Sequence, residues 1–318
     1  MTKTVLILGA SGRIGRHSIK AFDAAGWQVR RFDRKNDNMG KAAMGCDVIV
    51  NGLNPPNYHN WSVTIPKITE EVITAAKASG ATVIIPGNVY HFGDQGGTWS
   101  EHTPPLPVSR KGQIRLDMER RYAESGVQTI VLRAGNFIDP DQQGCIMSAL
   151  YLRSIKQRKI MLPGPADTRQ AMCFLPDWAR ACVALSEMRN DLSQFEDIPF
   201  PGHTLTAQDI KSELEAQLHR PLRFARFPWW AFKVSAPFWE MAREMLEMRY
   251  LWSTDHALCG KRFSSLLPGF LPTPFQEVMR ASLPSALQPA TRGLPEASTV
   301  MVASTNTSRA STEARRMS

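Results

Sequence analysis

The first half of the chain alternates short apolar runs with longer stretches of helical periodicity. Runs of β-branched and aliphatic residues predict buried parallel strands at residues 4–8, 28–32, 47–51, 82–85 and 128–132. Between them, apolar side chains recur at helical spacing, which predicts helices over residues 14–25, 65–79 and 112–125. Each of these helices ends at a glycine. Because parallel strands need crossover connections, we expect an α/β fold with a Rossmann-type doubly wound parallel sheet.

The pattern loosens after about residue 140. Residues 172–175 predict a sixth strand, and residues 178–189 predict a helix with Asp177 as its N-cap, so we expect residues 170–190 to complete the sheet. Thr206 predicts the start of another amphipathic helix over residues 206–219. The last residues are rich in Ser, Thr, Ala and Arg, which is typical of disorder. We expect a Rossmann domain over residues 1–140, a smaller C-terminal lobe over 141–287 and a disordered tail over 288–318.

Composition narrows the class of protein. Of the 318 residues, 43% are hydrophobic and 21% are charged, as in ordinary globular proteins. No apolar run is long enough to span a membrane, so we expect no membrane partner. The five cysteines are odd in number and lack CxxC spacing, which favours free thiols in the cytoplasm and no metal site. The net charge of +9 is scattered along the chain, so we expect no nucleic-acid partner, and basic charge also suits a phosphorylated cofactor.

Three glycines separate the first predicted strand from the first predicted helix. Gly9 permits a tight turn, Gly12 lets a phosphate approach the backbone, and Gly15 lets the helix pack closely on the strand. The helix N-terminus adds unpaired N–H groups and a partial positive charge. This segment therefore predicts a nicotinamide dinucleotide site. The cofactor-binding residues expected here are Gly9, Ser11, Gly12, Arg13, Ile14 and Gly15.

Asp33 and Arg34 follow the second predicted strand, where dinucleotide-binding folds distinguish NAD from NADP. An acid at this place hydrogen-bonds the adenosine ribose hydroxyls, whereas an arginine accommodates the 2′-phosphate of NADP. Arg13 and Arg31 are near in sequence, and several guanidinium groups suit a phosphate dianion. The two indications disagree, and we favour NADP while keeping NAD open.

Beyond the Gly-x-x-Gly-x-x-Gly turn, three segments resemble one known family. They are VYHFGDQGGTWSEHTPPLP (residues 89–107), LRAGNFIDP (132–140) and FLPDWARACVAL (174–185). They resemble conserved stretches of the NAD(P)-dependent epimerase/dehydratase group, the extended and atypical short-chain dehydrogenase/reductases. The resemblance covers about residues 1–215. It implies an oxidoreductase or epimerase that acts on a small molecule held by the C-terminal lobe.

The resemblance breaks at the family's catalytic positions, which hold a Ser and a Tyr-x-x-x-Lys pair. Aligning residues 109–121, SRKGQIRLDMERR, places Lys111 at the Tyr position and Arg115 at the Lys position, while the serine falls near Pro86. Two cations four residues apart at a helix start need an anion nearby, or the lysine pKa falls. A lysine of lowered pKa can move a proton. The alignment therefore predicts an altered relay, with Lys111 as proton-transfer residue and Arg115 as catalytic residue and ribose ligand.

Other candidates follow the fourth predicted strand, at the sheet edge where ligands bind in such folds. Tyr90 is a third catalytic candidate, although a packing role is also open. His91 is a substrate-site candidate because a histidine pKa ordinarily lies near neutrality. Asn88 could replace the missing serine as a hydrogen-bond donor to a substrate oxygen. Asn136 falls where the family contacts substrate.

Two functions remain open. One is an NAD(P)-dependent enzyme with the altered relay. The other is a sensor similar to NmrA-like proteins, which keep the cofactor site, lack the Tyr-x-x-x-Lys pair and report cofactor redox state to a partner. The Trp-rich residues 228–252 fit a core, a homodimer interface or a flat wall for a ring-bearing substrate.

Overall fold

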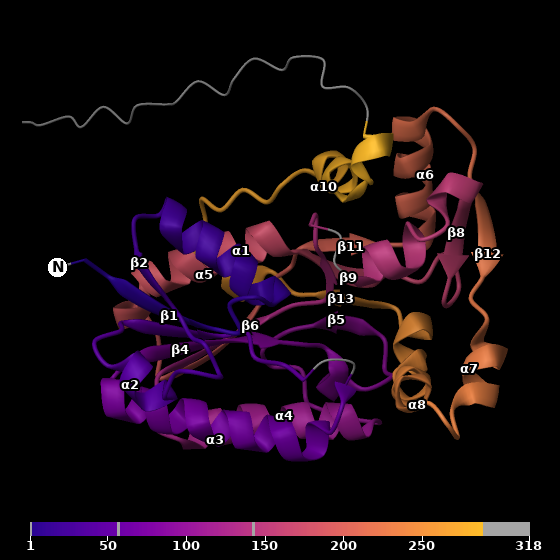
Figure 1. The fold of residues 1–318 in the computed structure, drawn as a ribbon. Coiled ribbons are helices and arrows are strands. Elements are labelled where there is room, and N and C mark those ends of the chain that lie inside the picture. The colour runs from indigo at the N-terminus through magenta and orange to yellow at the C-terminus, as the bar shows by residue number, and fades with distance from the viewer. Residues whose placement is uncertain (1, 56–57, 142–143, 289–318) are drawn as a thin grey trace, which may run out of the picture. The chain divides into compact units, whose positions relative to one another are not determined.

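The computed structural model describes residues 2–55, 58–141 and 144–288, and its centre is a parallel sheet. The strand order is β10-β6-β4-β3-β1-β2, and every neighbouring pair runs in the same direction (Figure 1). The strands are β1 (Thr4–Leu8), β2 (Gln28–Arg31), β3 (Val48–Asn51), β4 (Thr82–Gly87), β6 (Thr129–Arg133) and β10 (Phe195–Pro199). The predicted Rossmann-type sheet is confirmed.

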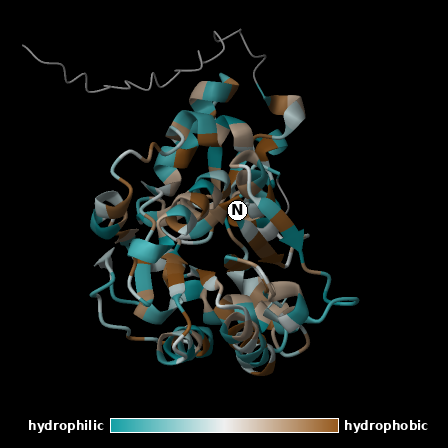
Figure 2. Ribbon diagram, turned by 90° about the vertical axis from the view of Figure 1, so that its left-hand side faces the viewer, coloured by the Kyte–Doolittle hydropathy of each residue, from teal (hydrophilic) through white to brown (hydrophobic). Residues whose placement is uncertain are grey.

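Helices bury both faces of the sheet. Val5 and Ile7 of β1 pack under α1 (Arg13–Ala24) and α5 (Leu175–Glu187), while Leu6 and Leu8 point to the opposite face. That face is covered by α3 (Trp61–Ser79) and α4 (Arg110–Glu124), with the short α2 (Met39–Ala43) beside α3. Figure 2 shows hydrophobic residues concentrated on the central strands. Burial of both faces explains why the strands read as continuous apolar runs.

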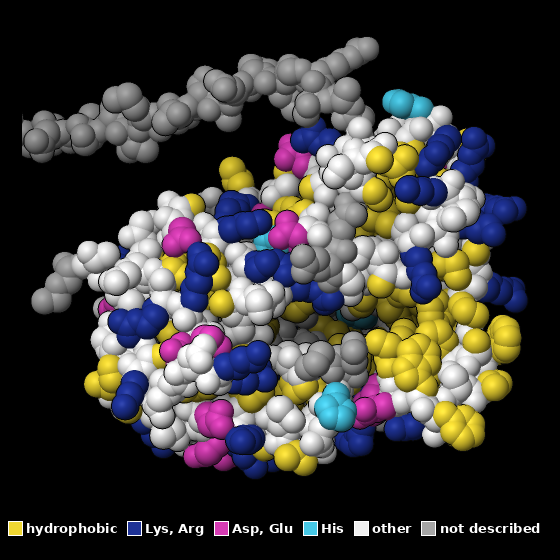
Figure 3. Space-filling model, in the orientation of Figure 1, with side chains coloured by type: hydrophobic (Ala, Val, Ile, Leu, Met, Phe, Trp, Pro, Cys, Tyr) yellow, Lys and Arg dark blue, Asp and Glu magenta, His cyan; other side chains and the backbone are white. Residues whose placement is uncertain are grey.

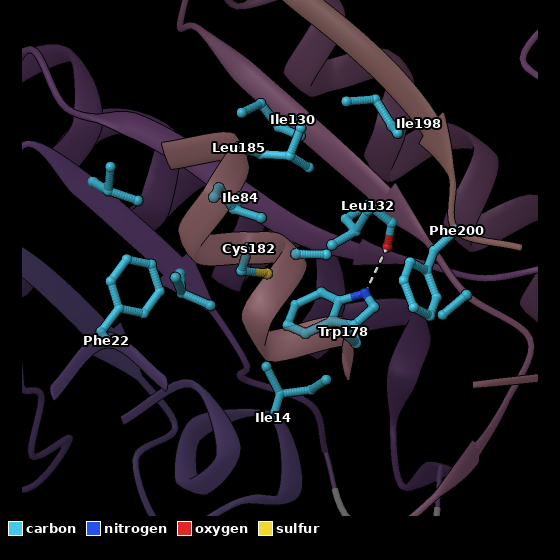
Figure 4. Packing of buried hydrophobic residues seen from close by; sticks show 14 of the residues in the cluster. Ile14, Phe22, Ile84, Ile130, Leu132, Trp178, Cys182, Leu185, Ile198 and Phe200 are labelled. Atoms are coloured by element: carbon cyan, nitrogen blue, oxygen red, sulfur yellow. Dashed lines mark hydrogen bonds between the residues drawn. The ribbon is translucent and has the colours of Figure 1, made fainter. Parts of the chain in front are cut away.

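Trp178 anchors the layer formed by α1 and α5. Its fully buried indole lies among Ile14, Leu132 and Phe200, and its Nε1 donates a hydrogen bond of 3.1 Å to the Leu132 carbonyl (Figure 4). The hydrogen bond satisfies the only polar atom of a large apolar side chain. It also fixes α5 against β6, the strand that leads into the candidate site.

The sixth strand of the sheet differs from the prediction. Residues Gln170–Phe174 do form a strand, β9, but it lies in a separate sheet with β7 (Asn136–Ile138) and β11 (His203–Leu205). The central sheet is completed by β10, whose sequence FEDIP contains two acids. Glu196 and Asp197 interrupt the apolar pattern, which hid the strand, and each pairs with an arginine in the structure.

Two helix starts were predicted with different success. Thr206 caps α6 (Ala207–Leu218) in a reciprocal capping box with Asp209, as its sequence position predicted. The predicted N-cap Asp177 is wrong, because α5 begins at Leu175 with Phe174 as its N-cap. Asp177 lies in the first turn instead, where its buried carboxylate accepts hydrogen bonds from the backbone and hydroxyl of Thr273.

Residues of the expected C-terminal lobe pair with each other and with the first half of the chain. β8 (Lys159–Leu162) pairs with β12 (Arg223–Arg226), and β13 (His256–Leu258) pairs with β5 (Gly97–Trp99). The remaining helices are α7 (Trp229–Ser235), α8 (Glu240–Glu247), α9 (Lys261–Leu266) and α10 (Phe275–Ser282). The described residues up to Gln288 form one compact unit. The predicted tail beyond residue 288 lies outside the described residues.

Candidate functional site

The glycine turn has the geometry that a phosphate cradle needs. Gly9 has a left-handed backbone with φ of 75°, and a Cβ there would lie 2.9 Å from the Gly52 carbonyl oxygen. A Cβ on Gly15 would lie 2.2 Å from the Gly9 carbonyl oxygen, and one on Gly12 would lie 3.1 Å from it. No side chain caps the N-terminus of α1, so its first amide groups are left for another acceptor. The turn therefore fits an anion held against the backbone.

The remaining residues of the turn surround this helix start. Ser11 is exposed at its tip, whereas Ile14 is buried beneath it against the sheet. The Ser11 carbonyl accepts a hydrogen bond of 3.2 Å from Nη1 of Arg16. Arg13 is partly exposed and lies 4.0 Å from the buried Asp139 carboxylate. Two arginine side chains thus lie at the N-terminal end of α1.

Three residues of types that can ligate a metal lie close together near the turn. Asp139, His17 and Asp141 bring their ligand atoms within 4.8 Å of one another. Ion pairs account for this cluster, because Arg16 lies 3.2 Å from Asp139 and 3.6 Å from Asp141. His17 contacts Asp139 at 3.0 Å. Cations already fill the places that a metal ion would take.

Asp33 and Arg34 differ in how free their side chains are. The Asp33 carboxylate accepts hydrogen bonds from the Lys35 backbone amide at 2.9 Å and from Asn36 Nδ2 at 2.6 Å, which closes a turn after β2. Arg34 is exposed and has no ion pair or hydrogen bond within the described part of the chain. Its guanidinium is therefore available to a ligand, while the Asp33 carboxylate is partly used by its own turn.

Lys111 is fully buried in the first turn of α4, and its ammonium is bound by α8. Nζ lies 2.7 Å from Glu247 Oε2, contacts a carboxylate oxygen of Glu244, and donates to the Glu244 backbone carbonyl at 3.3 Å. The ammonium thus donates two hydrogen bonds and forms an ion pair with each of the two carboxylates. Of the two outcomes that the sequence allowed for paired cations, the structure shows the nearby anion. The proton-transfer role of Lys111 stays a prediction, and it would require α8 to release the ammonium.

The Arg115 guanidinium contacts the loop after β3 and the start of α3. Its Nη2 donates a hydrogen bond of 3.1 Å to Asn54 Oδ1, and its guanidinium lies 4.8 Å from the centre of the Trp61 ring. Burial lowers the pKa of Arg115. Its Nε is buried and has no hydrogen-bond partner among the described residues, so this side chain retains an unused donor.

Tyr90 meets a second tyrosine that sequence reasoning missed. The Tyr90 hydroxyl lies 3.3 Å from the Tyr58 hydroxyl, and burial raises the pKa of Tyr90 well above its usual value. The Tyr58 ring also lies 5.1 Å from Lys111 Nζ, so this residue touches two of the three predicted catalytic residues. Tyr58 has a left-handed backbone with φ of 62°. No sequence motif marks it, since its place depends on the path of the loop after β3.

The three predicted substrate residues occupy different settings. Asn88 accepts a hydrogen bond from the Tyr90 backbone amide at 3.0 Å, and its amide nitrogen has no partner among the described residues. Asn136 is half-buried at the start of β7. His91 is buried with Nδ1 at 3.2 Å from Arg133. Burial, aided by the Arg133 charge, lowers the pKa of His91 to about 3, in contrast to the near-neutral value on which its predicted role rested.

Arg133 is the centre of a buried ion network at the end of β6. Its guanidinium lies 2.8 Å from Glu119 of α4 and 2.6 Å from Asp197 of β10, and Nη1 donates to the Asn88 carbonyl at 2.6 Å. Charge-assisted hydrogen bonds of this length are strong and directional. The network joins β6 to α4 and β10, and its hydrogen bond to the Asn88 carbonyl positions the segment that carries Asn88, Tyr90 and His91.

A cavity of about 600 Å³ lies in the C-terminal part of the chain. Its walls come from the turn after β8, the end of β12 and the start of α7. Besides prolines and aromatic rings, it contains the guanidinium groups of Arg226 and Arg249. The lining residues include Leu162, Pro163, Ala166, Phe227, Trp229 and Trp230. Apolar walls with a few charged groups are typical of small-molecule sites.

Comparisons with known proteins identify the fold. No family model and no curated protein sequence matches the chain. Among solved structures, MoeE5 in complex with UDP-glucose and NAD matches with a TM-score of 0.68 and 16% identity, covering 90% of this chain and 97% of that one. UDP-glucuronic acid 4-epimerase from Bacillus cereus, in complex with UDP-glucuronic acid and NAD, matches with a TM-score of 0.68 and 16% identity, covering 88% of this chain and 97% of that one. RMD from Pseudomonas aeruginosa, complexed with NADPH, matches with a TM-score of 0.66 and 16% identity, covering 89% of this chain and 98% of that one. The chain therefore has the fold of these proteins, whose structures hold NAD or NADPH, over most of its length.

Proposed function

We propose that this protein binds NAD or NADP and acts as an oxidoreductase or epimerase on a small molecule. The observation that carries the proposal is the glycine cradle at the uncapped start of α1, in which side chains at Gly9 and Gly15 would collide with backbone. The fold around it is shared with structures that hold NAD or NADPH. A bound nicotinamide would supply the hydride chemistry, and the chain's own residues would bind and orient it.

The residues at the carboxyl edge of the sheet would bind different parts of the cofactor and the substrate. The α1 amides and Arg13 would bind the pyrophosphate, and Arg34 with Asp33 would select the adenosine end, with NADP favoured because Arg34 is free. Arg115 would hold the nicotinamide ribose, since its guanidinium reaches the loop after β3. Tyr90, in contact with Tyr58, is the proton-transfer candidate at that edge. Asn88 and Asn136 would contact the substrate.

The cavity beside α7 suits an anionic substrate with a flat ring. Arg226 and Arg249 offer guanidinium groups, and Trp229 and Phe227 offer aromatic faces. Two of the similar structures hold nucleoside diphosphate sugars, whose chemistry combines these features. We therefore place the substrate's recognition group in this cavity.

A dinucleotide sensor is the second candidate, and one observation favours it. Each predicted proton mover is held in a structural role or an unreactive state: Lys111 is bound by α8, Tyr90 has a raised pKa, and His91 a lowered one. Tight cofactor binding without turnover of sugar nucleotides, ketones or aldehydes would decide for the sensor. Turnover of any of them would decide for the enzyme.

The cradle is tested by replacing Gly12 with Asp. The new side chain would lie near the Gly9 carbonyl and place a negative charge where a phosphate would bind, so we expect Gly12→Asp to abolish binding of both NAD and NADP in calorimetry. Gly269→Asp is the matched control, because a Cβ there meets nothing within 4 Å. Unchanged affinity in a folded Gly12→Asp protein would place the site elsewhere.

A further inference from the structure

A hydrophobic surface lies on α7 and the turn that follows it. Trp230 and Val234 share one face of the helix, and Phe238 extends the stripe into the turn. Their exposed fractions are 72%, 70% and 94%, and the neighbouring Trp239 is 46% exposed. These four residues are called the α7 patch below. Figure 3 shows hydrophobic side chains gathered over this part of the molecule, on its right-hand side. Large apolar side chains that lie exposed near one another mark interaction surfaces.

The inner side of α7 is firmly packed, so the exposed side chains are not part of a loosened core. Trp229 is buried, and its Nε1 donates a hydrogen bond of 2.7 Å to the Pro163 carbonyl. The Phe232 ring lies 5.0 Å from Phe227 and 5.6 Å from Trp239. The inner side of α7 is therefore anchored to the rest of the chain, which leaves its outer side facing solvent.

Positive charge surrounds the α7 patch. Between residues 223 and 249, the exposed cations outside the substrate cavity are Arg223, Lys233 and Arg243. The acids of the same segment are engaged elsewhere: Glu240 contacts His59 at 2.9 Å, and Glu244 and Glu247 bind Lys111. Lysine and arginine side chains follow the same edge of the molecule in Figure 3. The surface thus combines protruding aromatic residues with exposed cations that form no salt bridge within the described part of the chain.

We propose that the α7 patch docks the protein on the surface of an anionic lipid bilayer. A helix with aromatic residues on one face and cations around it binds the interface, with its apolar face roughly 5 to 10 Å into the headgroup region. Trp and Phe would enter the headgroup boundary, and the surrounding arginines would face lipid phosphates. No described helix is long and apolar enough to cross a membrane, and this mode of binding needs none.

The position of Lys233 favours lipid over a protein partner. It is exposed on α7 between Trp230 and Val234, so a protein covering the patch would have to bury it or pair it. Lysine is depleted from the centres of protein interfaces, whereas on a bilayer its ammonium reaches the phosphates. A second copy of the chain would also bring the same cations face to face, which costs free energy.

The test is co-sedimentation of the full chain with lipid vesicles. We expect the protein to bind vesicles of equal parts phosphatidylcholine and phosphatidylglycerol, to bind pure phosphatidylcholine far less, and to release at high salt. Phe238→Ser removes a protruding aromatic side chain and should weaken binding on the order of tenfold. Lys233→Glu reverses a cation within the patch and should also weaken it about tenfold.

Matched controls sit on other surfaces. Leu271→Ser removes an apolar side chain that is 79% exposed, and Lys77→Glu reverses an exposed cation on α3, so neither should change vesicle binding. Equal loss in the controls would overturn the proposal, as would a wild-type protein that ignores both vesicle types. Sedimentation equilibrium without lipid supplies the remaining outcome: a dimer that Phe238→Ser dissociates would assign the patch to a second copy of the chain.

Discussion

Several candidate residues have a structural setting that differs from the role suggested by their side-chain chemistry alone. His91 has a side chain suited to proton transfer, yet it is buried beside Arg133, and its pKa falls to about 3. It stays neutral at physiological pH and packs against Phe92 with ring centres 4.1 Å apart. Arg115 has the opposite character, because it is partly enclosed but its Nε has no hydrogen-bond partner in the described part of the chain. The environment, which a single sequence does not display, determines which candidate can act.

Cofactor choice is predicted to depend on Arg34 and Asp33. Arg34→Ala removes a guanidinium that is free to bind the 2′-phosphate, and losing such a charge-assisted contact costs about 1.5 to 3 kcal/mol. Isothermal titration should show NADP binding weakened roughly ten- to a hundredfold, with NAD unchanged. Asp33→Asn should weaken NAD binding, because it removes the negative charge that would accept hydrogen bonds from the ribose hydroxyls. It keeps a side-chain oxygen that can accept from the Lys35 amide, so the turn should be preserved. Lys35→Ala, a neighbouring exposed cation, is the control. Equal effects on both cofactors would contradict the assignment.

At the scale of elements, α8 and α4 are joined through Lys111. Breaking a buried ion pair leaves charges without a partner, so we expect Lys111→Met to lower the free energy of unfolding by about 3 kcal/mol. Arg110 would still pair with Glu244 at 2.7 Å, which limits the loss. Urea denaturation measures the change. Lys111→Met combined with Glu244→Gln and Glu247→Gln removes the stranded charges and should recover much of the stability.

The same triple variant separates anchoring from proton transfer. If Lys111 only anchors α8, the stabilised triple variant should turn over substrate at the wild-type rate. A general acid or base contributes about 10²- to 10⁴-fold in rate, so a loss of that size in the stabilised variant would establish the predicted catalytic role. We expect the anchoring result, because the ammonium is buried in ion pairs with two carboxylates of α8.

Elements were predicted most accurately where a pattern of neighbouring residues is enough to determine the secondary structure. β1 was predicted at its observed bounds because every residue from Thr4 to Leu8 is buried, and α6 was located by its cap at Thr206. β10 was missed because its acids pair with arginines distant in sequence. The glycine cradle was predictable for the same local reason. Tyr58, Glu244 and Glu247 were not, since they reach Lys111 and Tyr90 only through the fold.

At the scale of the whole molecule, the expected boundary near residue 140 is crossed by several contacts. β5 pairs with β13 across 159 residues of sequence, with Gly97 opposite His256. Lys111 binds α8, and the buried Arg133 guanidinium pairs with Asp197 of β10 at 2.6 Å. These links are buried, so separating the two halves would expose charged and polar groups without partners. The described residues up to Gln288 should therefore unfold as one cooperative unit.

Cofactor binding should then protect the C-terminal lobe as strongly as the domain that carries the glycines. A ligand at a hundred times its dissociation constant stabilises the folded state by about 2.7 kcal/mol, which slows exchange through global unfolding roughly a hundredfold. With NADP present, amide hydrogen exchange in the central strands and in α6 should slow by the same factor, although α6 lies far along the chain from the cradle. In Gly12→Asp, the same NADP concentration should leave amide hydrogen exchange unchanged both in the central strands and in α6. Protection confined to residues before 140 would instead mean that the lobe unfolds on its own, as two separate domains would.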